Sequence, residues 1–267
     1  MNIYWQAHRG GGAYERPDNT MSANRYAWEL GGIPEADIRT TNDGVIVCLH
    51  DETPARTTTA PDEVKNQLIS EFTFAETRLW DAGIKFNEAF QGECIPSLEE
   101  VFQEMKGRPE RMMYLDLKEV NLSDLGRLID QYEVNRQVIF THYIQDNCRQ
   151  MKEIAREVRS MLWIGGNAEQ RMEKFRLAAS TGFEGLDQVQ FHLKIAEGNE
   201  DWSFDLEPAF LTEALALTER SGIDLELFPF SFDASSLHQL LDLGIRWYAT
   251  DEPALFLEGL NSWNHSK

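Results

Sequence analysis

The stretch IPEADIRTTNDGVIVCLHD, residues 33–51, contains the feature that decides the fold. It holds two β-rich runs, residues 33–39 and 45–49, which are separated by the five residues TTNDG. This connection is too short for the crossover that two parallel strands need, whereas Asp-Gly between two such runs is a hairpin signal. We therefore predict an antiparallel hairpin whose second strand stands outside the parallel order.

The rest of the chain alternates between β-rich runs and helical patterns. The β-rich runs are residues 3–7, 33–39, 45–49, 112–117, 137–141, 160–164, 185–191, 224–230 and 246–249. The helical patterns are residues 20–30, 97–105, 122–132, 145–158, 169–180, 208–221 and 234–243. Without the returning strand of the hairpin, eight strands remain, which favours an α/β fold of the (β/α)₈ TIM barrel type. Residues 52–93 show weak periodicity, and we predict that they form an inserted segment at the carboxyl-end mouth.

Length and composition set broad limits. The 267 residues fit one barrel domain spanning 1–267. The formal net charge of −20 argues against a non-specific grip on nucleic acid or anionic lipid. No signal peptide and no long apolar run is visible, and the three Cys are scattered, so we expect a cytoplasmic protein without stable membrane insertion. Nothing in the sequence specifies an oligomeric state.

The hairpin predicts where its polar residues meet. Strand alternation places Glu35 and Asp37 on one face of the first strand. If the turn centres on residues 43–44, His50 faces Asp37 across the ladder, so two carboxylates and a His meet at one level. Buried carboxylates are costly unless they bind a metal or a cation. One of the two acids could bond a neighbouring Arg, but two acids on one face favour a metal site.

A later strand repeats this pattern with Asp116 and Lys118, which share a face at the expected carboxyl end. Active sites of barrels collect at that end. The alternative for this pair is an ion pair that caps the strand. With Glu35 and Asp37 nearby, we favour Asp116 as a third metal ligand.

His8 and Arg9 end the first strand and are followed by three glycines, which let the backbone approach a ligand closely. A lone His is more often structural, but His50 is a second His at the predicted mouth, and Arg suits bidentate phosphate binding. Two His beside three acids, Arg9 and Lys118 suggest an acid–base pair around a metal-bound anion. His192 also lies near a strand end and could line the mouth.

These residues resemble the glycerophosphodiester phosphodiesterase family, a branch of the PLC-like phosphodiesterase barrels. The motifs that carry the resemblance are His8-Arg9-Gly10, Pro17-Asp18-Asn19-Thr20, Glu35-Ala36-Asp37, Thr41-Asn42-Asp43-Gly44, His50-Asp51, Arg56-Thr57-Thr58, Asp116-Leu117-Lys118, Phe230-Ser231-Phe232-Asp233 and Thr250-Asp251-Glu252-Pro253. Their order and spacing span nearly the whole chain.

The resemblance implies a metal-dependent hydrolase of lipid metabolism that converts a small glycerophosphodiester to glycerol phosphate and an alcohol. It implies His8 and His50 as the acid and base, and Arg9 and Lys118 as ligands of the substrate phosphate. It also implies one divalent ion, Mg²⁺ or Ca²⁺, on three carboxylates, namely Glu35, Asp37 and Asp116.

Two positions depart from the family pattern. Asp116 replaces the usual Glu. Phe230 replaces the usual Trp of the substrate-facing wall, and Phe230 and His192 are the candidates for that wall here. The sphingomyelinase D-like phospholipases carry D-x-K where this chain has Asp116 and Lys118. A lysophospholipid or sphingolipid phosphodiesterase that forms a cyclic phosphate is therefore one alternative, and a non-catalytic barrel that binds an anion is another.

Overall fold

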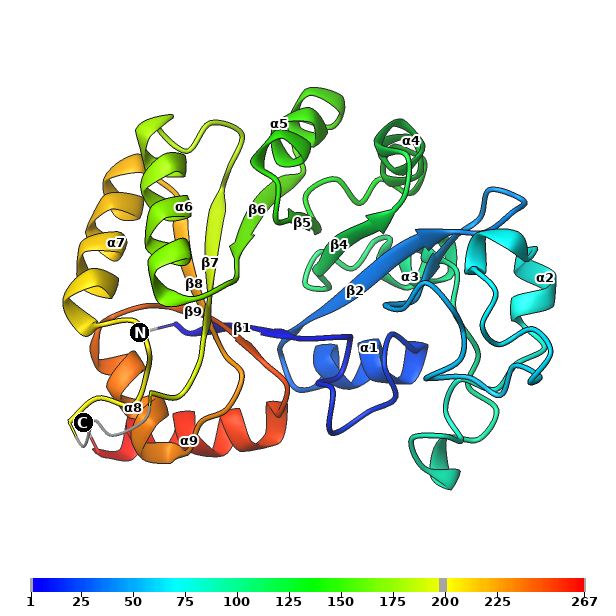
Figure 1. Cartoon of the computed structure of the whole chain (residues 1–267), viewed down its shortest axis with the longest axis horizontal. Helices are drawn as coiled ribbons and strands as arrows, with labels where there is room; N and C mark the ends of the chain where they lie inside the picture. Colours follow the sequence, from blue (N-terminus) through cyan, green and yellow to red (C-terminus); the bar gives the residue numbers. More distant parts are fainter. Residues whose placement is uncertain (1, 197–200, 267) are drawn as a thin grey trace.

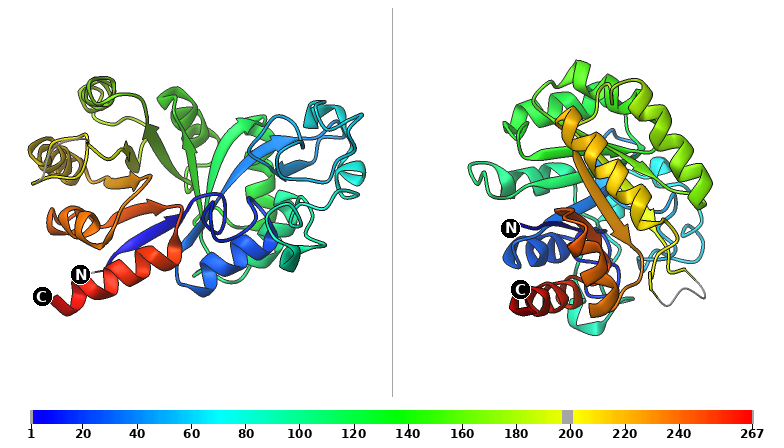
Figure 2. Two further views of the ribbon diagram at one scale, coloured as in Figure 1. Left: turned by 60° about the horizontal axis from the view of Figure 1, so that its bottom comes forward. Right: turned by 90° about the vertical axis from the view of Figure 1, so that its left-hand side faces the viewer.

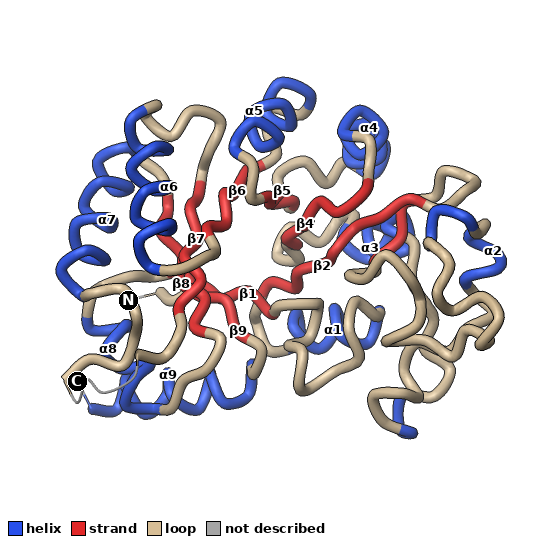
Figure 3. Tube along the Cα trace, in the orientation of Figure 1, coloured by secondary structure: helices blue, strands red, loops and turns tan. Residues whose placement is uncertain are grey.

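A closed ring of parallel strands forms the centre of the molecule. A computed structural model describes residues 2–196 and 201–266. Eight strands pair in the order β1-β9-β8-β7-β6-β5-β4-β2, and a β1–β2 pairing closes the ring. The helices surround this ring (Figure 1, Figure 3). The predicted (β/α)₈ barrel is confirmed, and so is the hairpin, because β3 pairs antiparallel with β2 outside the ring.

Each predicted strand is present, with ends that differ by a few residues. The strands are β1 Tyr4–Ala7, β2 Ile33–Thr40, β3 Ile46–Cys48, β4 Met113–Glu119, β5 Val138–His142, β6 Arg159–Ile164, β7 Gln188–Leu193, β8 Asp224–Pro229 and β9 Trp247–Thr250.

The seven predicted helical patterns also form helices, and the structure adds two α-helices that the sequence did not predict, α2 and α9. The α-helices are α1 Met21–Glu29, α2 Phe74–Thr77, α3 Leu98–Met105, α4 Leu122–Tyr132, α5 Gln145–Ile154, α6 Ala168–Ser180, α7 Pro208–Ser221, α8 Ala234–Asp242 and α9 Pro253–Ser266. Short 3₁₀ turns are η1 Ile69–Glu71 and η2 Glu88–Phe90. The unpredicted α9 packs against α8 in both views of Figure 2. Every described helix is too short or too polar to cross a membrane.

The predicted register of the hairpin is wrong by one residue. Ile38 pairs with Cys48, which puts Leu49 rather than His50 opposite Asp37, and Leu49 N donates to Asp37 O at 2.8 Å. The reason is the loop, which has three residues rather than two. Thr41 N donates to Val45 O at 2.9 Å, and a glycine with φ of 82° precedes Val45. A left-handed residue at that place is typical of three-residue hairpin loops.

The inserted segment 52–93 contains η1, α2 and η2 and lies to one side of the barrel (cyan in Figure 1). It has an apolar cluster of its own, which includes Ile69, Phe72 and Trp80 and continues onto the hairpin through Val47. The segment therefore packs on the hairpin, and this packing holds its first residues beside the barrel mouth.

The interior of the barrel holds a buried polar network as well as apolar side chains. Glu226 on β8 is fully buried and accepts hydrogen bonds from Tyr114 Oη at 2.9 Å and Gln190 Nε2 at 2.8 Å, and a further one from Gln188. Burial raises the pKa of Glu226 to about 7, although the hydrogen bonds from Gln190 and Tyr114 act to lower it. No cation is hydrogen-bonded to this carboxyl group among the described residues.

We expect this burial to make stability depend on pH. Between pH of about 4.5 and 7 the native state keeps a proton on Glu226 that the unfolded chain has lost, so the free energy of unfolding falls as pH rises. Glu226→Gln cannot lose that proton and should show a smaller fall between pH 5 and pH 8, by on the order of 3 kcal/mol. Denaturant unfolding at both pH values measures this difference. The exposed Glu213→Gln is the control, and an unchanged slope in Glu226→Gln would contradict the assignment.

Candidate active site

Three carboxylates meet on the neighbouring strands β2 and β4. These strands are parallel neighbours in a register that puts Asp37 beside Asp116. Oxygen atoms of Glu35, Asp37 and Asp116 lie within 4.8 Å of one another, and Glu35 and Asp37 are 2% and 1% exposed. The sequence predicted this grouping. It also predicted that Lys118 would lie on the face of Asp116, and Lys118 does join the cluster.

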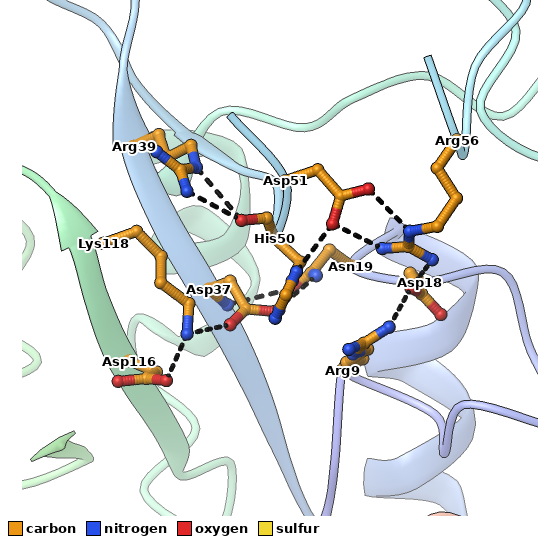
Figure 4. A network of polar contacts seen from close by, with 10 residues as sticks. All are labelled: Arg9, Asp18, Asn19, Asp37, Arg39, His50, Asp51, Arg56, Asp116 and Lys118. Atoms are coloured by element: carbon orange, nitrogen blue, oxygen red, sulfur yellow. Dashed lines mark hydrogen bonds and ion pairs between the residues drawn. The ribbon is translucent and has the colours of Figure 1, made fainter. Parts of the chain in front are cut away.

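Lys118 and Asn19 hold the acids in place. Lys118 Nζ lies 2.7 Å from Asp116 Oδ2 and 3.1 Å from Asp37 Oδ1 (Figure 4). Asn19 Nδ2 donates to Asp37 Oδ2 at 3.0 Å, and Asn19 Oδ1 accepts from the backbone N of Asp37. Burial by itself raises the pKa of Asp37, but Lys118 and the nearby His side chains hold it below the ordinary value. Asp37 is therefore ionised at neutral pH.

Glu35 is the least compensated of the three acids. Its Oε2 accepts from the backbone N of Arg9 at 2.7 Å, but the buried Oε1 has no hydrogen-bond partner among residues 2–196 and 201–266. Burial and the charge of Asp37 raise the pKa of Glu35 well above its ordinary range. A buried carboxylate oxygen without a partner is unfavourable unless a ligand reaches it. The residues present thus fit a divalent cation bound by three carboxylates.

His8 extends from β1 into the same hollow. Its backbone N donates to Thr250 O, and its Nδ1 donates to Asp251 Oδ1 at 2.7 Å. Burial lowers the pKa of His8, but the hydrogen bond to Asp251 and the charge of Glu35 outweigh this effect and raise it. Because Asp251 occupies Nδ1, the other ring nitrogen is left for a ligand.

His50 reaches the hollow although its predicted pairing with Asp37 is wrong. It lies two residues beyond the end of β3, so its position depends on local contacts rather than on the ladder. Its carbonyl oxygen accepts from Arg39 Nε and Nη2 at 3.1 and 3.0 Å, and its ring Nδ1 donates to Asp51 Oδ1 at 2.7 Å. Arg39 thus holds the backbone of His50, and Asp51 orients its ring.

Arg9 follows His8 in the left-handed region, with φ of 55°. This conformation turns its backbone N toward Glu35, while its Nη1 donates to Asp18 Oδ2 at 2.9 Å. The same residue therefore contacts the acid cluster through its backbone and presents a guanidinium at the mouth.

An aromatic wall forms the other side of the hollow. His192 stacks on Trp163, with ring centroids 5.1 Å apart and planes 7° apart. Phe230 and Phe228 contact the His192 ring edge to face, and Phe230 is 39% exposed. Burial lowers the pKa of His192 to about 3, so its ring is neutral.

These side chains enclose one hollow of about 210 Å³. Its lining residues are Gln6, His8, Arg9, Glu35, His50, Asp116, Lys118, Thr141, Met161, Trp163, Gln190, His192, Phe228 and Phe230. Asp37 is not part of the lining, but it contacts Lys118, which is. The structure thus brings together every candidate site residue of the sequence analysis.

Sequence reasoning missed the partners that orient these residues. Asp251 holds His8, Asn19 holds Asp37, and Trp163 Nε1 lies 3.3 Å from Asp116 Oδ1. Asn19 is free for this role because Thr20, the next residue, caps α1 by accepting from Ala23 N. The motif segments that contain Asp251 and Asn19 were signals for both residues, whereas nothing in the sequence pointed to Trp163.

Comparisons with known proteins find relatives in sequence and in fold. Residues 8–255 match the model of the glycerophosphoryl diester phosphodiesterase family. A glycerophosphodiester phosphodiesterase of Caldanaerobacter subterraneus subsp. tengcongensis is 30% identical over 257 residues, which cover 92% of this chain and 93% of that protein.

Two solved structures share the fold. A glycerophosphodiester phosphodiesterase from Agrobacterium tumefaciens superposes with a TM-score of 0.74 at 20% identity, over 96% of this chain and 99% of that one. A phosphodiesterase from Oleispira antarctica, solved in complex with the product sn-glycerol-3-phosphate, gives a TM-score of 0.73 at 18% identity, over 97% and 96% of the two chains.

The carboxylate cluster should make stability respond to metal. We expect millimolar Mg²⁺ or Ca²⁺ to raise the unfolding temperature of the wild type, since an ion at 100 times its Kd adds about 2.7 kcal/mol to the native state. Glu35→Gln should lose this response, yet without metal it should be at least as stable, because it removes a poorly compensated buried carboxylate. Differential scanning fluorimetry measures both effects.

The exposed acid Asp62 provides the control for this experiment. Asp62→Asn should keep the full response to the ion. A Glu35→Gln protein that is stabilised as strongly as the wild type would show that the ion binds elsewhere.

Proposed function

The chain belongs to the glycerophosphoryl diester phosphodiesterase family, and from this premise we propose that residues 1–267 act as one domain that hydrolyses glycerophosphodiesters to glycerol phosphate and an alcohol. One observation carries the proposal. Two His, each bonded to an Asp, share a single hollow with two carboxylates of the cluster, a Lys and an Arg, and the third carboxylate, Asp37, lies beside it. This set matches the needs of phosphodiester cleavage, which are an acid, a base and positive charge around phosphorus.

Glu35, Asp37 and Asp116 would hold one divalent ion, Mg²⁺ or Ca²⁺. The donors are all oxygen atoms, which hard cations prefer, whereas Zn²⁺ usually takes His or Cys. When bound, the ion would neutralise negative charge on the phosphoryl oxygens.

Arg9 and Lys118 would bind the remaining charge of the phosphate. Both line the hollow, and both are already fixed by carboxylates, Arg9 by Asp18 and Lys118 by Asp37 and Asp116. Such preorganised cations lose little entropy when the substrate binds.

His8 would act as the acid and His50 as the base. Asp251 stabilises the protonated form of His8, so this ring can hold a proton for the oxygen of the leaving alcohol. Asp51 orients His50 through Nδ1, which leaves its other nitrogen to remove a proton from the attacking hydroxyl group. The two rings come from different strand ends and can therefore act on opposite sides of one phosphorus atom.

The attacking group would belong to the substrate. Thr141 is the hydroxyl side chain of the lining, and its Oγ1 has no hydrogen-bond partner among the described residues, so no base activates it. The glycerol hydroxyl next to the phosphoester would give its proton to His50 and attack phosphorus, forming a cyclic phosphate. The alcohol would leave with the proton of His8, and water would then open the ring to glycerol phosphate.

A second candidate substrate class is the lysophospholipids. Tyr143 and Ile144 after β5 are 51% and 44% exposed, and Phe230 is partly exposed at the mouth. An exposed apolar rim suits an acyl chain. A panel of glycerophosphocholine, glycerophosphoethanolamine and lysophosphatidylcholine tests the two classes, and we propose higher kcat/KM for the diesters without an acyl chain.

The roles of the two His give a direct prediction. His8→Ala and His50→Ala should each lower kcat by about 10²–10⁴-fold, because each removes a proton-transfer group. Their unfolding temperatures should stay near that of the wild type. His265→Ala is the control, since this His is exposed on α9. Near-wild-type turnover of His50→Ala would contradict its role as the base.

The substrate hydroxyl gives a second prediction. A deoxy analogue that lacks the hydroxyl next to the phosphoester should still bind as a competitive inhibitor, but it should be turned over far more slowly. Phosphorus NMR during turnover of the normal substrate should show a cyclic phosphate. Equal rates for both substrates, without a cyclic species, would support direct attack by water instead.

A further inference from the structure

Arg56, in the inserted segment, links the two sides of the proposed active site. It lies outside the hollow and has no contact with the carboxylate cluster among the described contacts. Its guanidinium bonds two carboxylates at once, as Figure 4 shows. Nε donates to Asp51 Oδ2 at 2.6 Å and Nη2 to Asp51 Oδ1 at 3.1 Å, while Nη1 donates to Asp18 Oδ2 at 2.7 Å.

Each of these carboxylates holds one functional side chain. Asp51 accepts from His50 Nδ1 at 2.7 Å, and Asp18 accepts from Arg9 Nη1 at 2.9 Å. A continuous series of charged contacts therefore runs from His50 through Asp51, Arg56 and Asp18 to Arg9.

The side chains at the two ends of this series have no other hydrogen bond among the described contacts, since Arg39 holds the backbone carbonyl of His50 and Glu35 accepts from the backbone N of Arg9. His50 lies beyond the end of β3, and Arg9 lies in the loop after β1, so neither is fixed by a strand ladder. Asp18 is largely buried, with 8% of its side chain exposed, and it accepts from both arginines. Without Arg56, the Asp51 and Asp18 carboxylates would have no shared partner, and each could turn with the group that it holds.

The planar fork of arginine is suited to this bridge, because it presents separate N–H groups to two carboxylates in one plane. A Lys ammonium is a point charge that cannot reproduce this geometry. The side chain of Arg56 is 44% exposed, so an isolated ion pair here would contribute little to stability. The bridge would therefore matter for the positions of the two carboxylates rather than for the stability of the fold.

We propose that Arg56 is a positioning residue that fixes the side chains of His50 and Arg9 relative to each other. The inserted segment would thereby complete the active site. This inference rests on the proposed function, because it assigns His50 to proton transfer and Arg9 to phosphate binding. Loss of the bridge acts on both roles: it lowers kcat through His50 and raises KM through Arg9.

The test compares Arg56→Lys and Arg56→Gly with the wild type on glycerophosphocholine. Displacement of a reacting group by about 1 Å costs on the order of 10²-fold in rate, so we expect kcat/KM to fall by about 10–100-fold, divided between kcat and KM. Arg56→Lys should resemble Arg56→Gly rather than the wild type. Arg78→Lys is the matched control, because Arg78 lies in the same segment and pairs with Glu100 away from the hollow.

Chemical rescue distinguishes positioning from general folding support. Guanidinium ion at millimolar concentration should raise the kcat/KM of Arg56→Gly at least fivefold. Ammonium at the same ionic strength should not raise it. If Arg56→Gly does not fold, the kinetics of Arg56→Lys decide alone. Wild-type values of kcat and KM in Arg56→Lys, or a loss equal to that of Arg78→Lys, would overturn the inference.

The wild-type control separates this inference from the proposed function. An inactive wild type, assayed with each divalent ion, would show that the proposed function has failed. An active wild type whose kcat and KM do not change with Arg56 would leave that function intact and overturn the role of Arg56.

Discussion

Repulsion among three carboxylates is the constraint on which the site depends. The parallel register of β2 and β4 places Asp37 beside Asp116, and strand alternation adds Glu35 on the same face. Such crowding costs free energy in a folded chain, since burial and like charge both oppose ionisation. Lys118 and Asn19 compensate Asp37, and Glu35 keeps a buried oxygen without a partner among the described residues. The neighbouring groups thus hold the acids in place without fully satisfying them, as a cation site requires.

Contacts between distant parts of the chain convert this cluster into a site. His8 follows the first strand and Asp251 the last, so the pairing of β1 with β9 that closes the barrel also sets the hydrogen bond between these two side chains. Asp116 lies between Lys118 Nζ and Trp163 Nε1. Trp163 in turn stacks on the neutral His192, so the aromatic wall and the acids are packed together. Barrel closure and site geometry therefore depend on the same contacts.

The sequence was sufficient to predict the fold and which residues gather at the site. It was less informative about the contacts that hold these residues in place. Alternation and the short TTNDG connection predicted the barrel and the hairpin, because both depend on local periodicity. The register was wrong because Thr41 and Val45 close a three-residue loop, a difference that dipeptide preference does not resolve. His50 was still placed at the mouth, since it lies beyond the strand. Trp163 could not be predicted, because its contact with Asp116 joins residues 47 positions apart.

The central claim is that Glu35, Asp37 and Asp116 form one divalent metal site at the barrel mouth. Diffraction from crystals soaked in Mn²⁺, recorded at the manganese absorption edge, tests it most directly. Our account predicts one strong anomalous peak among the three carboxylates, in the hollow that His8 and His50 share. A peak at another place, or no peak in crystals of a protein that is fully active in the presence of chelator, would contradict it.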